Sequence, residues 1–356
     1  NRVHVSKEMT LAYRLLKKYF VDLKIFGYKT GSKCGGWIIP PSWDVQRGIL
    51  KDPNGKIIAD WCKNKLALWT YSVSFKGKIE KEKLNNKILS NPEKPNATTF
   101  HFRNQYNFWK KEWGFSLPYK IHKQLKKGKY SVDIKTSSNK GKLEMAEDVH
   151  HGKIDDSFLF LGHFDHPQMC LDGLVGCLAG HELIYRLRKK QTKLTYRMLS
   201  TVEIIGSVFY TKYHAKKNKV KQALFIACPG AHQNIGYQQT FLKNNQIDKI
   251  TIHVLKSLNI NFKTHDFRKG PIGNDEIAYD VGGTNIPCGS LMRAPFESYH
   301  TDFDTPSGVS WKNFEETILV LEEIIHIFEN NSTLHRNFKG LPRLSSKKLD
   351  LYLSPD

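Results

Sequence analysis

The chain has 356 residues, of which 40% are hydrophobic and 12% aromatic, and its formal net charge at pH 7 is +21. This length and composition suffice for one large hydrophobic core or two modest ones. No apolar run approaches the roughly 20 residues of a membrane span, and the cysteines lack C-x-x-C spacing, which argues against a disulfide framework or a zinc finger. We therefore expect a soluble globular protein of the cytoplasm, with no signal peptide at Asn1–Val5.

The positive charge is mostly lysine and is spread along the chain. Runs such as Lys123–Tyr130 and Lys216–Lys221 have the composition of turns or helix ends, where lysines are usually solvated. Clustered basic residues would bind phosphate through counterion release, so a basic partner surface stays the alternative. We do not expect nucleic acid to be the partner.

The beginning of the chain predicts a helix and then a connection. Apolar residues recur at helical spacing over residues 10–20, with Leu11, Leu15 and Tyr19 on one stripe. Residues 31–42 are rich in glycine and proline, which indicates an irregular connection.

From about Trp43 to about Ile134 the sequence has short periodicities and many turn signals. Asp52–Gly55 reads Asp-Pro-Asn-Gly, a β-turn signal between two short apolar runs. Large apolar side chains alternate with small polar ones over residues 69–75, which predicts a half-buried strand. We expect a small β-rich domain here.

After a polar stretch at residues 135–142, predicted strands and helices alternate. The strands are expected at 157–161, 196–201, 223–228 and 288–291, and the helices from about Leu174 and over Trp311–Asn330. Alternation of this kind predicts an α/β sheet with helices on both faces.

Metal-ligand side chains gather where the first of these strands ends. His163, Asp165, His166 and Asp172 all follow the apolar run at 157–161. Imidazole and carboxylate are among the ligands that zinc takes. Open α/β sheets place their chemistry at the C-terminal ends of strands, so this stretch predicts a metal site.

Further candidates lie at other predicted strand ends and loops. Glu203 follows the next strand, His232 follows the strand after it, Asp275 lies in a Gly-Asn-Asp-Glu run, and Tyr299 and His300 precede the last helix. None of these positions is specific when taken singly.

Taken in order, these residues resemble a known family, the co-catalytic zinc aminopeptidases, which include bacterial leucyl aminopeptidases, glutamate carboxypeptidases and glutaminyl cyclases. The similar motifs are His163-x-Asp165-His166, Asp172-Gly-Leu-x-Gly, Glu203 with Gly-Ser three residues on, Asn274-Asp-Glu and Tyr299-His-Thr. More narrowly, the chain resembles aminopeptidase-like proteins of bacterial surface-polysaccharide clusters, which carry a small inserted domain of unknown function.

The resemblance covers most of residues 10–330 and implies a fold. It implies a mixed sheet flanked by helices in three αβα layers, with a small β-rich inserted domain. The aminopeptidase-like domain would then be discontinuous, at 1–45 and 143–340, with the insertion at 46–142 and a C-terminal tail at 341–356.

The resemblance also implies residue roles and a cofactor of one or two zinc ions. His163 and His300 match metal-binding histidines, and Asp172 matches an aspartate that bridges two metal ions. Asp165 matches a carboxylate that orients His163 through its ring N–H. Glu203 matches a residue that either binds metal or takes a proton from a metal-bound water.

Two positions depart from the family pattern. Active relatives carry adjacent glutamates, one the base and one a ligand, but Glu203 stands between Val202 and Ile204. The carboxylate ligand expected after residues 223–228 is missing from the sequence, and His232 is the nearest substitute. The chain therefore holds one metal ion, two with an unusual ligand, or none. His166 and Asp275 are further candidate ligands.

Simpler structural roles are alternatives for three of these residues. Asp172 could be simply the cap of the helix that follows it. His166 could be a turn residue before a proline, and His300 could cap the last helix.

Arg293 and Tyr299 are candidates for substrate binding. A guanidinium group binds a carboxylate or phosphate in a bidentate manner, which makes Arg293 suitable. Arg293 could equally pair with an internal acid such as Glu297.

Two functions follow from these observations. The first is a zinc-dependent aminopeptidase or amidohydrolase that acts on a small peptide-like or glycoconjugate substrate, in surface-glycan synthesis. The second is a catalytically impaired relative that serves as a ligand-binding or assembly module. The retained His163, Asp172, Glu203 and His300 favour the first, and the missing carboxylates favour the second. We expect no membrane partner and leave a homo-oligomer open.

Overall fold

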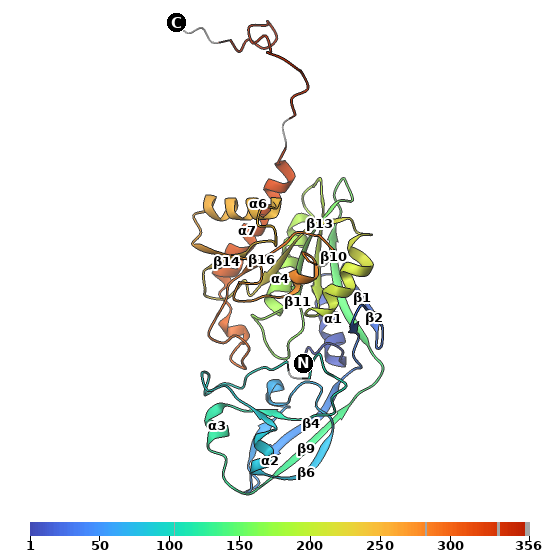
Figure 1. Ribbon diagram of the computed structural model, residues 1–356, viewed down its shortest axis with the longest axis vertical. Helices are drawn as coiled ribbons and strands as arrows, with labels where there is room; N and C mark the ends of the chain where they lie inside the picture. Colours follow the sequence, from blue (N-terminus) through green and yellow to red (C-terminus); the bar gives the residue numbers. More distant parts are fainter. Residues whose placement is uncertain (103, 282, 333–334, 353–356) are drawn as a thin grey trace.

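The computed structural model describes residues 1–102, 104–281, 283–332 and 335–352, and a mixed eight-stranded sheet forms its centre (Figure 1). From edge to edge its strands are β1 (Lys24–Lys29), β10 (Lys142–His150), β12 (Thr195–Thr201), β11 (Ser157–His163), β13 (Val220–Ala227), β16 (Cys288–Met292), β14 (Ile235–Gln238) and β15 (Phe262–His265). The central strands β12, β11, β13 and β16 are parallel. The sheet confirms the predicted fold class.

Strand β11 is the most deeply placed part of the sheet. Every one of its residues is buried, and it pairs in parallel with β12 on one side and β13 on the other. A parallel strand covered on both faces is expected to be a continuous apolar run, which is what residues 157–161 provide. The first candidate metal ligand, His163, is the last residue of this strand.

Helices cover both faces of this sheet. Helices α4 (Leu174–Leu187) and α6 (Gln246–Ser257) both pack on α7 (Trp311–Asn330). Because β-α-β crossovers are right-handed, α5 (Ile205–Tyr210), which leads from β12 back to β13, lies on the opposite face from α4. The π-helical turn η2 (Thr211–Ala215) continues α5, and the 3-10 turns η3 (Asp275–Ala278) and η4 (Pro306–Gly308) lie in loops. Among the described residues, no helix is both long and apolar enough to cross a membrane.

Helix α1 (Lys7–Tyr19) forms close to the predicted position but buries another face. Tyr13 and Leu16 are buried, whereas Leu11, Leu15 and Tyr19 are each more than half exposed. The hydroxyl of Tyr13 donates to a carbonyl of β12 at 3.2 Å, so this face packs on the main sheet. The predicted apolar stripe was therefore wrong.

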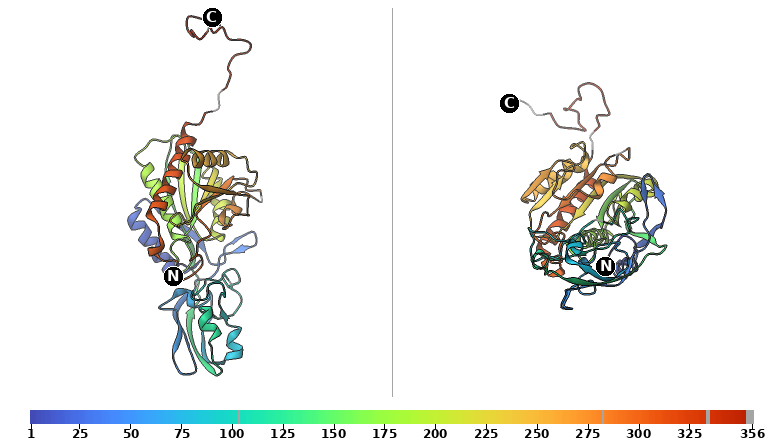
Figure 2. Two further views of the ribbon diagram at one scale, coloured as in Figure 1. Left: turned by 90° about the vertical axis from the view of Figure 1, so that its left-hand side faces the viewer. Right: turned by 60° about the horizontal axis from the view of Figure 1, so that its bottom comes forward.

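A second, antiparallel sheet lies beside the first, at the lower end of the molecule in Figure 1 and in the left view of Figure 2. Its strands, in order, are β5 (Ile57–Asp60), β4 (Asp44–Lys51), β9 (Lys129–Ser137) and β6 (Phe75–Glu80). We call residues 44–137 the small-sheet region. It has a hydrophobic core of its own, which includes Leu50, Trp61 and Phe115. This extra sheet confirms the β-rich part of the predicted fold.

The remaining elements are short. They are η1 (Lys65–Ala67), α2 (Lys81–Asn85), β7 (Ile88–Leu89), β8 (Phe115–Ser116) and α3 (Tyr119–Lys123) in the small-sheet region, and the hairpin of β2 (Lys33–Cys34) and β3 (Trp37–Ile38) before it. That hairpin lies inside the stretch for which we expected only an irregular connection.

Local turn chemistry explains one correct and one wrong prediction in the small-sheet region. The turn at residues 52–55 joins β4 to β5, and the Asp52 carboxylate accepts the backbone N–H groups of Asn54 and Lys56 at 2.9 Å. The strand predicted at 69–75 is absent apart from its last residue, which begins β6. Tyr71 has a positive φ of 58°, which an extended strand cannot contain.

The small-sheet region leaves the main sheet and returns to it at one place. The backbone N–H of Ser42 donates to the carbonyl of Asn139 at 2.8 Å, and Asp44 pairs with Ser137 at the base of β4 and β9. The limits of an inserted domain, 46–142, stay a prediction.

Beyond α7 the chain runs away from both sheets in every view (Figures 1 and 2). Residues 335–352 are almost all exposed. The predicted tail begins at 341, and its last residues, 353–356, lie outside the described part of the chain.

Candidate metal centre

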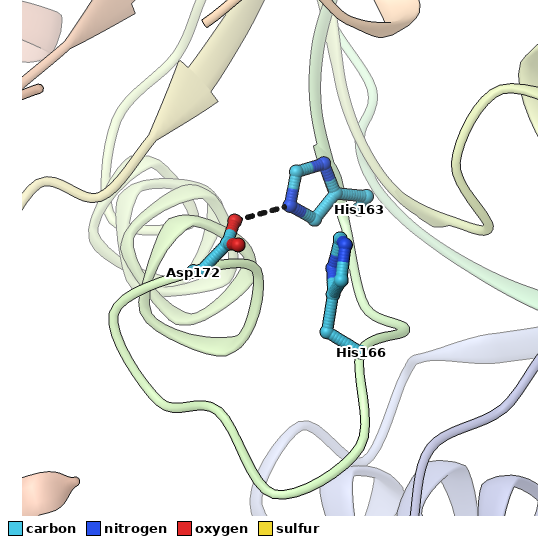
Figure 3. A group of neighbouring side chains, drawn as sticks. All are labelled: His163, His166 and Asp172. Carbon is cyan, nitrogen blue, oxygen red and sulfur yellow. Dashed lines mark hydrogen bonds and ion pairs between the residues drawn. The ribbon is translucent and has the colours of Figure 1, made fainter. Parts of the chain in front are cut away.

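Three of the predicted ligands meet at the C-terminal end of β11 (Figure 3). His163 ends the strand, His166 lies on the loop after it, and Asp172 lies two residues before α4. The Nε2 atom of His163 is 3.0 Å from an oxygen of Asp172, and one ligand atom from each of the three residues lies within 4.8 Å of the others. All three side chains are almost completely buried.

His300 joins this group from the loop before α7. Its Nε2 atom is 3.0 Å from the second oxygen of Asp172, so the carboxylate lies between two imidazoles. The ring of Tyr299 stacks on that of His300 with a centroid distance of 3.9 Å. Tyr299, predicted to bind substrate, therefore contacts a candidate ligand directly.

Glu203 reaches the same place from the end of β12. Its Oε2 atom is 3.1 Å from Nε2 of His166, and a second group of candidate ligand atoms consists of Asp165, His166 and Glu203. His166 therefore belongs to both groups. From the sequence we expected His166 only as a secondary candidate, but in the structure it lies between the two groups.

The capping alternatives for Asp172 and His300 do not agree with the structure. The side chain of Asp172 makes no capping hydrogen bond to α4, and helix α7 is capped by Ser310 instead. The carboxylate of Asp304 accepts the backbone N–H groups of Leu171 and Asp172 at 2.7 and 2.9 Å, which fixes the chain before α4. The Asp172 carboxylate is thus directed to the histidines.

The predicted partner of His163 was wrong. We expected Asp165 to orient the ring, but the Nδ1 atom of His163 is 3.8 Å from the carboxylate of Asp275. Asp165 lies 3.3 Å from the His4 ring and accepts the backbone N–H of Glu203 at 3.0 Å. Asp275 thus lies behind the candidate ligand His163 rather than beside the other candidate ligand atoms. The loop that carries η3 brings it there, which sequence distance alone could not show.

Arg293 is not free to bind substrate. It is 3% exposed, pairs with Glu316 on α7, and donates to the carbonyl of Gln233 at 2.7 Å. The alternative pairing with Glu297 was also wrong, because Arg293 directly follows β16 and contacts Thr317 and Glu316 of α7 instead.

His232 is also displaced from the centre. Its side chain is exposed and lines a surface groove with Leu171 and Phe296. In the described part of the chain, His232 belongs to neither group of candidate ligand atoms. The loop after β13 therefore brings no carboxylate and no imidazole to these groups.

Burial and neighbouring charges act in opposite directions on the pKa values of the groups in the centre. Burial opposes ionisation of Asp172, but the rings of His166, His163 and His300 outweigh it and hold the pKa of this carboxyl well below its usual range. Burial lowers the pKa of His163, but Asp172 and Asp275 outweigh it and hold the pKa well above its usual value. Burial raises the pKa of Asp275 itself.

The donor atoms fit a metal ion. Oδ2 of Asp172, Nε2 of His166 and Oε2 of Glu203 are buried, lie about 3 Å from a facing ligand atom and form no hydrogen bond with any described residue. Buried polar atoms almost always have partners. Imidazole nitrogens and carboxylate oxygens are the ligands of zinc, and a cation between them would satisfy these atoms.

Several contacts around the centre were missed in the sequence. His4 faces Asp165, Arg2 donates to the carbonyls of Phe164 and Met169, and Tyr106 donates to the carbonyl of Glu203 at 2.8 Å. These residues are far from the motifs in sequence, and no local pattern marks them.

The fold defines the class as aminopeptidase-like. The zinc aminopeptidase BSAP from Bacillus subtilis superposes with a TM-score of 0.67 over 91% of this chain and 90% of its own, at 10% identity. A "putative peptidase" from Clostridium acetobutylicum superposes with a TM-score of 0.85 and 27% identity, over 96% of this chain and 81% of that chain.

The chain belongs to the family described as domain of unknown function DUF4910, whose model matches residues 1–331. It is also 28% identical, over 337 residues, to a Clostridium acetobutylicum protein named "Putative polysaccharide biosynthesis protein with aminopeptidase-like domain". This match spans 94% of this chain and 76% of that protein. The resemblance inferred from the motifs is thereby confirmed.

Proposed function

We propose that this chain is a metal-dependent hydrolase that cleaves an amide bond in a small aminoacyl or amino-sugar compound. The observation that carries the proposal is the convergence of buried ligand atoms without hydrogen-bond partners at the C-terminal edge of the sheet. The residues that would hold zinc are His163, His166, Asp172, Glu203 and His300. When bound there, zinc would polarise the scissile carbonyl and lower the pKa of a bound water.

The protein's own groups have separable tasks in this proposal. Asp172 holds the rings of His163 and His300 on either side of its carboxylate. Asp275 faces the outer nitrogen of His163 and limits the orientations of that ring. Glu203 lies next to these groups and is 8% exposed. Its carboxylate can therefore both face the centre and reach a proton on a substrate.

A groove beside the centre suits such a substrate. Two adjoining cavities of about 400 and 410 Å³ share Phe296, Glu297 and Phe303 as walls. They reach Tyr299 and Leu171, which directly precede His300 and Asp172 in the chain. The walls carry apolar rings, the carboxylates of Glu93 and Glu297 and one ammonium group, that of Lys94. Because carboxylates outnumber ammonium groups among these walls, the groove favours a ligand with an apolar body and a protonated amine. An amine-bearing amide fits this description.

The proposal of a role in surface-glycan synthesis has a narrower basis. The name of the Clostridium acetobutylicum relative mentions polysaccharide biosynthesis. Polysaccharide biosynthesis uses amino sugars, and an amide of an amino sugar would be a suitable small substrate for an amidohydrolase.

A ligand-binding module without catalysis is the second candidate. The specific observation in its favour is that Glu203 has no neighbouring glutamate and that the loop after β13 offers only the exposed His232. One carboxylate would then have to serve as both ligand and base.

Metal analysis tests the proposal. Protein purified without chelator is expected to contain about one or two zinc equivalents by mass spectrometry, and His163→Ala and His300→Ala are expected to lose them. His326→Ala is the matched control, because this histidine is exposed on α7. A wild-type protein that takes up no metal even from added zinc would refute the hydrolase.

Substrate screening then separates the two candidates. The hydrolase predicts turnover of aminoacyl or amino-sugar amides by the zinc-loaded protein, and its loss in Glu203→Gln. Metal binding with ligand affinity but without turnover across such a set would favour the binding module.

A further inference from the structure

Both backbone groups of Glu203 are held by side chains. Its N–H donates to the carboxylate of Asp165 at 3.0 Å, and its carbonyl accepts the hydroxyl of Tyr106 at 2.8 Å. These two bonds fix the peptide planes on either side of the Cα atom. The direction in which the Glu203 side chain leaves the backbone is therefore set by residues other than its own strand.

The two anchors come from different parts of the chain. Asp165 lies on the loop after β11, and its second oxygen is 3.3 Å from the ring of His4. Tyr106 belongs to the small-sheet region, and its neighbour Gln105 lies 2.7 Å from the same His4 ring. The small-sheet region thus contacts Glu203 directly through Tyr106. It also contacts Asp165, the second anchor of Glu203, indirectly through His4.

The loop that carries His300 is held by the same region. The backbone N–H of Phe100 donates to the carbonyl of His300 at 2.9 Å, and that of Asp302 donates to the carbonyl of Thr98 at 3.0 Å. The Asp302 carboxylate in turn accepts the N–H of Thr98 at 2.9 Å and the side-chain amide of Asn64 at 2.8 Å.

This support matters because His300 has an uncommon backbone conformation. Its φ of 57° is left-handed, which is costly for a residue other than glycine and persists only where the surroundings fix it. Residues 98–100 and Asn64 provide those fixing contacts.

Aromatic rings of this region also border the histidines. Phe100 packs edge-on against the rings of His166 and His300, at centroid distances of 5.0 and 5.5 Å. Phe102 contacts the ring of His300 at 5.4 Å. These rings limit the motion of both imidazoles on the side that faces the small-sheet region.

We propose that the small-sheet region is a positioning element of the metal centre, in which Tyr106 orients Glu203 while Asn64 and residues 98–100 orient His300. The inference rests on the proposed function, since it assumes that these two residues meet a metal ion. It assigns a task to the part of the chain that lies outside the main sheet and contributes none of the candidate ligands. Tyr106 and Asn64 are positioning residues rather than ligands.

Cobalt substitution tests this proposal. Co²⁺ replaces zinc, and its visible spectrum reports the arrangement of its ligands. Tyr106→Phe removes one hydroxyl and leaves the ring in place. We expect a changed cobalt spectrum and roughly 10-fold weaker metal retention against a chelator, the size of effect usual for residues that support a ligand. The matched control is Tyr130→Phe, because the Tyr130 hydroxyl also donates to a backbone carbonyl, at 2.9 Å, in the same region but away from the centre.

The possible outcomes separate the two proposals. If wild-type protein binds cobalt and Tyr106→Phe gives the same spectrum and affinity, the positioning role is wrong and the metal centre stands. Equal changes in the Tyr106 and Tyr130 variants would also overturn it, since they would reflect general loosening. A wild-type protein that binds no cobalt would overturn the metal centre itself and the inference with it.

A second variant covers the case in which Tyr106→Phe does not fold. Asn64→Ser removes the amide that holds Asp302 and leaves Tyr106 intact. We expect the spectrum to change through His300, with far-ultraviolet circular dichroism unchanged. An unchanged spectrum in a folded Asn64→Ser protein would count against the proposal.

Discussion

Asp172 lies between two histidine rings in the candidate centre. Its two oxygens each lie 3.0 Å from an imidazole nitrogen, one of His163 and one of His300. The carboxylate is 1% exposed, so its negative charge is compensated by these rings rather than by water. The charge, and not only the shape, of this side chain should therefore decide metal binding.

Asp172→Asn is expected to weaken metal affinity by more than about 100-fold, because the variant keeps the shape and loses the charge on which a ligand depends. Isothermal titration with zinc would measure it. Asp248→Asn is the control: this carboxylate is also 1% exposed, but it holds Tyr237 and Thr240 beside α6. That variant should lose stability and keep its metal affinity; equal affinities of the Asp172 variant and the wild type would contradict the assignment.

Arg293 should matter for stability rather than for substrate. Truncation to Ala leaves Glu316 and the carbonyl of Gln233 without their buried partner, which we expect to lower the free energy of unfolding by about 3 kcal/mol. Urea denaturation measures this change. A variant with wild-type stability and a raised KM would restore the substrate role that the sequence suggested.

For individual residues, the order of the motifs predicted that His163, Asp172 and His300 come together, since each follows a strand or precedes a helix of the expected kind. It misassigned Asp165, because a two-residue spacing does not show which way a carboxylate turns. His4 and Tyr106 carry no sequence signal, since their contacts exist only once distant segments are folded together.

Helix α1 shows that the spacing of apolar residues can predict a helix but not which face of the helix is buried. The spacing of apolar residues predicted a helix, but two stripes of similar character compete on its surface. The structure buries the stripe of Tyr13 and Leu16 and exposes that of Leu11 and Leu15. Which stripe faces the sheet depends on β12 and on the loop after β11, which the helix sequence does not contain.

Two neighbouring leucines test this assignment. Leu16→Ala is expected to cost about 2 to 4 kcal/mol of unfolding free energy, because it leaves a cavity in the core. Leu15→Ala should cost less than about 0.5 kcal/mol, since that side chain is 54% exposed. Urea denaturation of both variants measures the difference; equal costs would contradict the observed face.

The packing of α4 on β12 predicts a pH dependence. His181 of α4 is fully buried and lies 2.8 Å from the hydroxyl of Ser200, and its burial lowers its pKa despite the nearby Asp148. The unfolded chain therefore binds this proton more readily than the folded protein below about pH 6.5, and the free energy of unfolding falls as the pH falls.

His181→Gln removes this titration. From pH 7.5 to 5.5 the stability of the wild type should fall more steeply than that of the variant, by up to about 1.4 kcal/mol per pH unit. Urea midpoints at three pH values would show it. Parallel pH profiles would mean that the pKa of His181 is not lowered by folding.

For the whole molecule, the sequence predicted the α/β alternation and the four parallel strands β11, β12, β13 and β16. It missed β10, β14 and α6, whose residues mix polar and apolar side chains because they lie toward the edges of the sheet or on its surface. The arrangement of the small-sheet region was also beyond reach, since antiparallel pairing of β4 with β9 joins residues distant in sequence.

Metal removal should affect both sheets. A ligand at about 1,000 times its Kd stabilises a protein by about 4 kcal/mol, so a chelator is expected to lower Tm by several degrees. Hydrogen exchange should also quicken at the amides of Phe100 and Asp302, which join the small-sheet region to the His300 loop. Protection at these two amides that does not change on chelation would show that the centre and the region are independent.

The chain enters the small-sheet region near Ser42 and leaves it near Asn139, and these two residues are hydrogen-bonded to each other. This proximity has a consequence for the evolution of the fold. A segment whose two ends meet can be gained or lost in one genetic insertion or deletion at a surface turn, without any strand of the main sheet changing its order. Sequence change on such an appendage is then free of the constraints on the parallel strands. Divergence within the family should therefore concentrate in residues 44–137, except at the few positions that touch the histidines and Glu203.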